Sequence, residues 1–246
     1  MALSDYKTAL VTGASSGIGE ATVRALAARG ITVYAAARRK EKLDDLATET
    51  GCIPLVLDVR DKAAIYSTLD NLEIDILVNN AGLGRGFEAI FEAAPDDIEM
   101  TLQTNVIGAA HVIRAVGEGM VKRNCGHIVN IGSVAGLYPI SSSVYGASKG
   151  AIHSLSQNLR IELKGKRIRV TEICPGRVAT NFFNIAVNDP EKSAKAFEGF
   201  EALTSEDISD AIIYAVDAPW RVNIGTIELS PTEQTFGGMQ INPATE

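Results

Sequence analysis

The segment TGASSGIG, residues 12–19, lies between a short β-branched run and a stretch whose apolar residues have helical spacing. Its glycines are Gly13, Gly17 and Gly19. Glycine lets the backbone turn tightly against a ligand, and the N-terminus of a helix offers free N–H groups to an anion. Glycines alone would also suit an ordinary turn. A strand before them and a helix after them predict a turn that binds the diphosphate of a dinucleotide.

The rest of the chain continues this alternation of strands and helices. β-Branched runs predict seven strands, near residues 10–12 and at 31–37, 53–59, 74–80, 127–133, 167–175 and 226–229. Helical spacing predicts helices at 20–29, 41–50, 96–122, 145–163 and 206–217. The alternation indicates an α/β fold with a doubly wound, mostly parallel seven-stranded sheet and helices on both faces, a Rossmann fold. We expect residues 1–246 to form a single domain, with a substrate-lid insertion around residues 181–205.

The bulk composition argues against several classes of partner. The net charge of the 246 residues is −7 and no block of lysine and arginine occurs, so we expect no nucleic-acid partner. No apolar run reaches the roughly 18 residues that a membrane helix needs, and the N-terminus lacks a signal-peptide pattern. We therefore expect a cytoplasmic protein with no membrane partner.

The cysteines and histidines are scattered along the chain. The cysteines, Cys52, Cys125 and Cys174, show no C-x-x-C spacing, which fits a reducing compartment. The histidines, His111, His127 and His153, have no paired ligand spacing. We therefore expect no metal site.

The end of the second predicted strand indicates which dinucleotide is bound. An NAD site places an acid there, which binds the ribose 2′-hydroxyl. This chain has no carboxylate between Gly30 and Lys40, and Arg38 and Arg39 stand there instead. Because a guanidinium pairs well with a phosphate, the sequence predicts NADP(H) rather than NAD(H). The alternative is that these arginines only begin the next helix in solvent.

Further motifs follow the predicted strands in order: LDV at 57–59, NNAG at 79–82, IGSVAG at 131–136, VYGASK at 144–149 and PGRVAT at 175–180. Together with the spacing G-x-x-x-G-x-G of the first turn, they resemble the short-chain dehydrogenases/reductases almost from end to end. The resemblance implies that the cofactor is bound by Gly13, Ser15, Ser16, Gly17, Ile18, Arg38, Arg39, Asp58, Val59, Asn80, Ala81, Gly82, Tyr145, Lys149, Pro175, Gly176, Val178 and Thr180.

Hydride transfer to a carbonyl leaves negative charge on its oxygen, so the protein must supply a hydrogen-bond donor and a proton. Lys149 follows Tyr145 by four residues, so both lie on one face of a helix, where an ammonium lowers a tyrosine pKa. By the resemblance, Tyr145 is the acid and base, Lys149 lowers its pKa and binds the nicotinamide ribose, and Ser133 donates to the substrate oxygen. Asn105 completes this tetrad by holding a helix distortion and a water in a proton relay. Without the other motifs, the Tyr145/Lys149 pair would equally fit a half-buried tyrosine beside a surface lysine.

Within the family, several segments resemble the NADP-dependent 3-hydroxy acid dehydrogenases that oxidise serine and allo-threonine, among them LDVRDKAAI at 57–65 and ELSPTEQTFGGMQI at 228–241. Sulfoacetaldehyde reductases share these features. Both substrate classes are anionic, so we expect a cationic group from Arg85 or Arg177 beside Ser133, although either arginine would also fit the solvated surface. The Ser133–Tyr145 spacing is one residue shorter than the family usually has, which leaves the substrate less defined than the reaction.

The resulting hypothesis is an NADP(H)-dependent oxidoreductase that transfers a hydride between the nicotinamide and a small alcohol or carbonyl, namely a 3-hydroxy acid or its semialdehyde. The alternatives are a reductase of sulfoacetaldehyde, a 3-oxoacyl substrate or a cyclic ketone, and a non-catalytic NADPH-binding protein. The family resemblance also implies a homo-oligomer, a tetramer or a dimer, assembled through the two long helices after the fourth and fifth strands.

Overall fold

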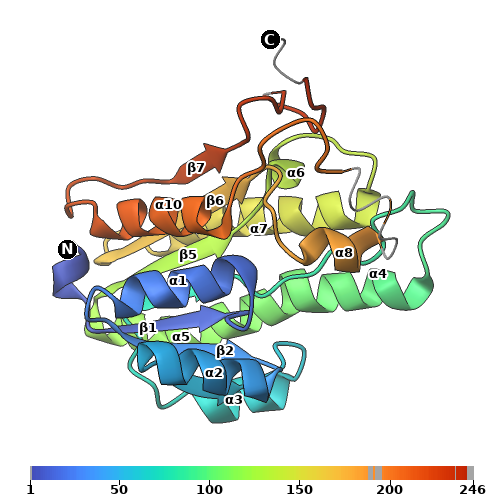
Figure 1. Cartoon of the computed structure of the whole chain (residues 1–246). Helices are drawn as coiled ribbons and strands as arrows, with labels where there is room; N and C mark the ends of the chain where they lie inside the picture. The colour runs from blue at the N-terminus through green and yellow to red at the C-terminus, as the bar shows by residue number, and fades with distance from the viewer. Residues whose placement is uncertain (1, 188–190, 192–195, 236, 243–246) are drawn as a thin grey trace.

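The computed structural model describes residues 2–187, 191, 196–235 and 237–242. Its centre is one parallel sheet with the strand order β3-β2-β1-β4-β5-β6-β7 (Figure 1). The strands are β1 (Thr8–Thr12), β2 (Thr32–Ala37), β3 (Ile53–Val56), β4 (Ile76–Asn79), β5 (Gly126–Ile131), β6 (Ile168–Pro175) and β7 (Thr226–Leu229). The order reverses between β1 and β4, which is where a doubly wound sheet opens a crevice for its ligand. The seven predicted strands and the Rossmann-type fold are confirmed.

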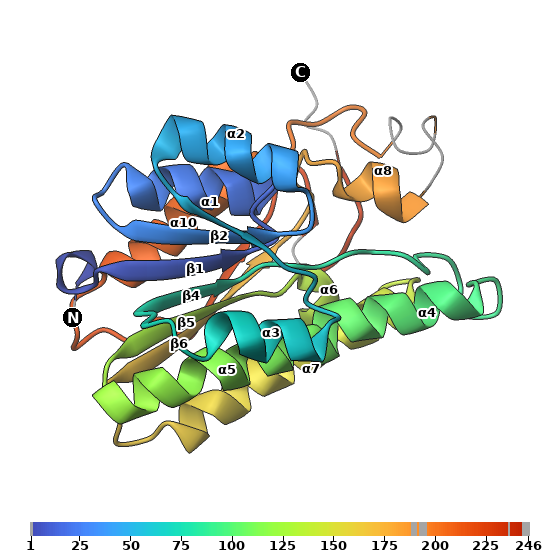
Figure 2. The same ribbon diagram turned by 90° about the horizontal axis from the view of Figure 1, so that it is seen from below.

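Helices cover both faces of the sheet (Figure 2). One layer holds α1 (Gly17–Ala27), α2 (Lys40–Thr50) and α10 (Ser205–Asp217), and the other holds α3 (Lys62–Leu69), α5 (Ala109–Arg123) and α7 (Ser143–Glu162). Each layer has its own core. Leu26, Leu43 and Ile212 belong to the first, whereas Ile65 and Met120 belong to the second.

Neighbouring residues of a central strand serve different cores. On β1, Ala9 and Val11 pack in the first cluster and Leu10 in the second, and all three are fully buried. A strand that is buried on both faces needs apolar residues at successive positions, which is why these runs stand out in the sequence. Among the described residues, no helix combines the length and the apolar character that crossing a membrane requires.

The long helix expected at 96–122 has three parts. They are α4 (Pro95–Leu102), the π-helical segment η2 (Gln103–Gly108) and α5. Four short elements were not predicted: η1 (Leu3–Asp5), α3, α6 (Val134–Leu137) and α8 (Phe182–Val187). α8 lies within the insertion expected at 181–205, of which residues 188–190 and 192–195 are outside the described residues.

Candidate active site

The motifs identified in the sequence meet at the carboxyl edge of the sheet. Gly13 follows β1, Asn80 follows β4, Ser133 follows β5 and Gly176 follows β6. A Cβ atom added to Gly13 would lie 2.8 Å from Nδ2 of Asn80, and the Ser133 hydroxyl donates to the carbonyl oxygen of Pro175 at 3.4 Å. The strand ends therefore place these segments side by side at one edge of the sheet (Figure 1).

The glycine turn after β1 has the geometry of a phosphate-binding turn. Gly13 and Gly17 have φ angles of 68° and 58°, which favour glycine. A Cβ atom on Gly19 would lie 2.5 Å from the carbonyl oxygen of Gly13, so only glycine allows the turn to close on itself. The free N–H groups at the start of α1 face this turn, and the residues present fit a dinucleotide diphosphate.

The NNAG segment is bound directly to the turn. The Thr12 hydroxyl accepts from the backbone N–H groups of Asn80 and Ala81 at 3.0 and 2.9 Å, and the Asn80 amide donates to the Thr12 carbonyl at 2.9 Å. The two segments that are predicted to bind the cofactor therefore form one hydrogen-bonded unit.

The two arginines after β2 have different surroundings. The Arg39 guanidinium donates to the hydroxyls of Ser15 and Ser16 at 2.9 and 2.7 Å, which places its charge over the glycine turn. Arg38 is exposed and acts on Asp58 through its charge. Arg60, which the sequence analysis did not select, donates to Asp58 at 2.6 Å and lowers the pKa of that carboxyl. The site thus gathers three cations where β1, β2 and β3 end.

The tetrad residues lie next to these segments at the same edge of the sheet. Tyr145 and Lys149 lie one turn apart on α7 and both are buried. The Lys149 ammonium lies 5.9 Å from the centre of the Tyr145 ring and donates to the Ile131 carbonyl at 2.8 Å. Ser133 begins α6, where its hydroxyl accepts from the Ala135 N–H at 3.1 Å. The side chain of Ser133 also hydrogen-bonds to the Tyr145 phenol.

Burial dominates the acid–base properties of this site. It raises the pKa of Tyr145 to about 12, and the Ser133 hydrogen bond opposes this only in part. Burial also lowers the pKa of Lys149 to about 8. Lys149 is not among the causes of this shift, and its ammonium is bonded to the Ile131 carbonyl, so the expected lowering of the tyrosine pKa by Lys149 stays a prediction. In this state Tyr145 holds its proton at neutral pH.

Asn105 lies in the π-helical segment η2, so the helix distortion expected around this residue is present. Its amide donates to the Leu83 carbonyl at 2.8 Å and to the Ser148 hydroxyl at 3.0 Å, and its oxygen accepts from the Leu83 N–H at 2.9 Å. These bonds tie the helix after α4 to the loop that follows NNAG and to α7. Asn105 thereby sets the position of the element that carries Tyr145 and Lys149.

Aromatic side chains cover the outer side of Tyr145, and the sequence analysis missed them. The Tyr145 ring lies 5.4 Å from Phe87 and 5.4 Å from Phe182, measured between ring centres. Phe183 lies 5.9 Å from Phe87 and extends the cluster towards Phe197 at 5.2 Å. The phenylalanines of the segment NFF, residues 181–183, were the available signal, but no spacing in the sequence connects them with Phe87.

The two arginines considered for an anionic substrate differ in their partners. Arg85 pairs with Asp97 at 3.2 Å and is exposed. The Arg177 guanidinium is half-buried and lies 5.8 Å from the ring centre of Phe183 and 5.9 Å from that of Phe200. It donates to the carbonyls of Ala196 and Met239, and no carboxylate among the described residues pairs with it. Arg177 is therefore a cation without an anionic partner in the described part of the chain, beside the cluster that covers Tyr145.

A glycine turn with arginines, a buried tyrosine and lysine on one helix, and a serine at the next strand end define a dinucleotide-linked dehydrogenase of the short-chain type. A family model for short chain dehydrogenases matches residues 7–191. The chain belongs to the short-chain dehydrogenase family.

Several known proteins are similar to this chain over nearly its whole length. The chain is 43% identical over 243 residues to the NADP-dependent 3-hydroxy acid dehydrogenase YdfG of Salmonella typhi, covering 95% of this chain and 98% of the relative. A solved structure described as the closed form of serine dehydrogenase complexed with NADP+ is 42% identical and superposes with a TM-score of 0.91, covering 96% of this chain and 100% of the other. Serine dehydrogenase from Escherichia coli is 41% identical with a TM-score of 0.81, covering 93% and 99% of the two chains.

Proposed function

We propose that this protein is an NADP(H)-dependent oxidoreductase that acts on the CH–OH group of a small 3-hydroxy acid, or on the carbonyl of its semialdehyde. The observation that carries the proposal is the convergence of Ser133, Tyr145 and Lys149 beside a glycine turn that Arg39 covers. The names of the relatives support both the cofactor and the hydroxy-acid class.

The proposed chemistry divides between the cofactor and the protein. When bound, the nicotinamide exchanges the hydride. In reduction, the Tyr145 phenol gives its proton to the oxygen that gains charge, and the Ser133 hydroxyl donates a hydrogen bond to the same oxygen. In oxidation, Tyr145 must first lose its proton and then accept one from the substrate hydroxyl. Lys149 holds a positive charge near the phenol, and Asn105 positions α7.

The remaining predicted contacts complete the cofactor site in this proposal. The turn that contains Ser15, Ser16 and Ile18 would hold the diphosphate, and Arg38 and Arg39 would bind the 2′-phosphate. Asp58 and Val59 would contact the adenine, and the segments 80–82 and 175–180 would bind the ribose and nicotinamide ends. The close fit between Gly13, Asn80 and Ala81 supports this path, because the three residues leave the ligand only the outer side of the turn.

Substrate selection is assigned to Arg177. No described carboxylate of the protein pairs with this guanidinium, so the carboxylate of a substrate can take that place. The phenylalanines around Arg177 exclude water and thereby strengthen the ion pair. Arg85 contributes less, because Asp97 already pairs with it. A sulfonate would satisfy the same charge, so sulfoacetaldehyde is the competing substrate.

Arg177→Ala tests this assignment. We expect kcat/KM for anionic substrates to fall by about 10- to 100-fold, the cost of a lost charged hydrogen bond, whereas a neutral ketone of similar size should lose little. NADP+ reduction is followed with L-serine, L-allo-threonine, 3-hydroxypropionate and isethionate, and Arg85→Ala is the matched control. Equal losses for anionic and neutral substrates would contradict the role of Arg177. A preference for isethionate would reassign the substrate while leaving the role of Arg177 intact.

We also propose a cytoplasmic homo-oligomer, a tetramer or a dimer. Apolar side chains are exposed along the helices after β4 and β5, as expected for an interface between copies: Leu102, Ile107, Val121 and Ile161. Contact between these helices of two copies would bury them.

A further inference from the structure

Three side chains that can bind a metal meet behind the catalytic helix. They are His153 on α7 and Glu172 and Cys174 on β6, and one ligand atom of each lies within 4.8 Å of the others. The sequence analysis expected no metal site, because the three histidines have no paired ligand spacing, and His153 and Glu172 are 19 residues apart in the chain. Alternation along β6 directs Glu172 and Cys174 to the same face of the sheet, which α7 covers.

The carboxylate of Glu172 is only half satisfied. Its side chain is fully buried, and Oε2 accepts from Nδ1 of His153 at 2.6 Å. The other oxygen, Oε1, is buried and has no nitrogen or oxygen partner among the described residues, and the Cys174 thiol is the second group that hydrogen-bonds to the Glu172 side chain. Oε1 lies directly over Gly132, where a Cβ atom would collide with it. A buried carboxylate oxygen without a partner is costly, so it marks a place where an additional ligand would be stabilised.

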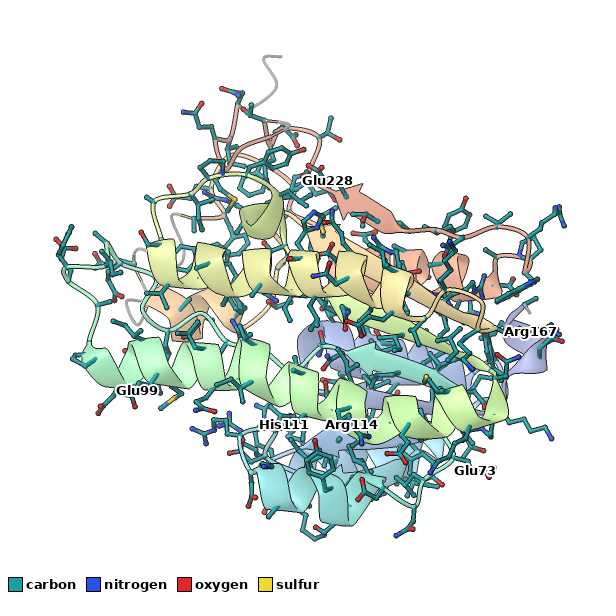
Figure 3. The ribbon with its side chains drawn as sticks, turned by 180° about the vertical axis from the view of Figure 1, so that it is seen from behind. Glu73, Glu99, His111, Arg114, Arg167 and Glu228 are labelled. Atoms are coloured by element: carbon teal, nitrogen blue, oxygen red, sulfur yellow. The ribbon has the colours of Figure 1, made fainter. Side chains whose placement is uncertain are left out.

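The cations that act on Glu172 through their charge do not neutralise it by direct bonds. They are Lys149 and Arg160, and their donors are bonded to the carbonyls of Ile131 and of Val170 and Gly225. Glu228 on β7, labelled in Figure 3, stands opposite Cys174 in the strand register. Its Oε1 is also buried and without a partner among the described residues.

We propose that His153, Glu172 and Cys174 form a binding site for one divalent ion of the zinc type. Imidazole nitrogen, thiolate sulfur and carboxylate oxygen are the ligands that zinc takes in proteins. Atoms bound to one zinc ion at about 2.0–2.3 Å lie no more than about 4.6 Å apart, so small side-chain shifts suffice. A carboxylate and a thiolate also neutralise the two charges of the ion, which makes a buried complex acceptable. Water fills the fourth position from the side of His153, whose side chain is 26% exposed.

The hydrogen bonds around His153 show which protons must move. The Gln157 amide lies 2.9 Å from Nε2 of His153 and donates to it, so the imidazole proton is on Nδ1 and points to Glu172. When zinc takes the lone pair of Nδ1, this proton moves to Nε2 and Gln157 turns to accept it through its oxygen. The Cys174 thiol loses its proton to solvent, and the sulfur electron pair forms the bond to the ion. Binding therefore releases one proton and strengthens as the pH rises.

The position of the proposed zinc site indicates which parts of the protein a bound ion would connect. His153 lies one turn after Lys149 on α7, and Cys174 directly precedes the PGRVAT turn at 175–180. An ion held by both would join the helix that carries Tyr145 to the strand that leads to the cofactor. We expect zinc to raise the thermal stability of the protein by binding its folded state.

The test uses the full chain after removal of metals with a chelator. Zinc is added, and its content after gel filtration and the melting temperature are measured. Cobalt replaces zinc in a second series, because thiolate bound to cobalt gives a near-ultraviolet charge-transfer band. We expect one zinc per chain, a higher melting temperature with zinc, and a cobalt–thiolate band.

Two variants and two matched controls identify the ligands. Cys174→Ala removes the thiolate, and His153→Gln keeps a donor for Glu172 but loses the imidazole. Both should lose at least about tenfold in zinc affinity, and Cys174→Ala should lose the cobalt band. Cys52→Ala changes a buried thiol elsewhere, and His111→Gln changes a histidine on α5 that lies on the far side of α7 from Glu228 (Figure 3); both should bind as the unchanged chain does.

Failure to retain zinc, or equal retention by all four variants and the unchanged chain, would overturn the proposal and leave a histidine–carboxylate pair only. Metal content, melting temperature and the cobalt band do not depend on turnover. The outcome is therefore separate from that of the proposed dehydrogenase function.

Discussion

At the scale of single residues, the proposed function depends on the proton of the Tyr145 phenol. Burial raises the pKa of this phenol to about 12, above its usual value of about 10. A phenol in this state is ready to act as an acid, because it is protonated at all physiological pH values. It acts as a base only after it loses the proton, so the two directions of the reaction should respond differently to pH.

We expect kcat/KM for alcohol oxidation to rise between about pH 7 and pH 10, because the fraction of phenolate rises as pH approaches the raised pKa. Carbonyl reduction uses the phenol and should not rise over this range. In Ser133→Ala the hydrogen bond that lowers the Tyr145 pKa is lost, so the oxidation profile should move to higher pH, with a loss of about 100-fold or more in kcat. Identical oxidation profiles in the unchanged chain and in this variant would argue against a coupled Ser133 and Tyr145.

The sequence predicted the site correctly where the residues that contact one another are also close in the chain. Tyr145 and Lys149 are four residues apart, and a helix of any origin brings them together. It failed where contacts join distant segments. Phe87 and Phe182 meet over Tyr145, and His153 meets Glu172, only because the sheet brings α7, β6 and the insertion to one place.

At the scale of elements, the strands were predicted better than the short helices. β5 and β6 are buried at every position, so each appears in the sequence as an uninterrupted β-rich run. α3 was missed because only Ile65 and Leu69 of its eight residues are buried, which is too little for a clear helical pattern. The helix expected at 96–122 is interrupted by η2, because Asn105 uses its amide to bind Leu83 and Ser148 across the helix.

The segment after β2 should select the dinucleotide, because its Arg39 bonds to the turn between β1 and α1. Arg39→Ala removes the guanidinium that bonds to Ser15 and Ser16. We expect KM for NADP+ to rise by about 10- to 100-fold and KM for NAD+ to change little, because only NADP+ carries the 2′-phosphate. Lys40→Ala is the matched control, since this exposed cation pairs with Asp44 in solvent. Parallel increases for NADP+ and NAD+ in Arg39→Ala would indicate damage to the turn rather than lost phosphate recognition.

At the scale of the whole molecule, the fold assembles the site by bringing strand ends together. The parallel order of the sheet places the segments after β1, β4, β5 and β6 at one edge, and the two cores behind them keep the edge in place. The reaction follows from this shared edge. In the proposed function, the substrate is selected where Arg177 of the PGRVAT turn meets Phe183 and Phe200. That is also where the sequence was least informative.

The most direct test of the account compares Tyr145→Phe with Tyr66→Phe and the unchanged chain, with NADP+ and L-serine or L-allo-threonine as substrates. Tyr66 is a matched control, because its hydroxyl bonds to His111 between α3 and α5. Binding of NADPH, followed by its fluorescence, should be retained in all three proteins. We predict that kcat falls by at least about 100-fold in Tyr145→Phe alone, since the phenylalanine can neither give nor accept the proton. Turnover by Tyr145→Phe near the rate of the unchanged chain would contradict the central claim that this phenol transfers the proton.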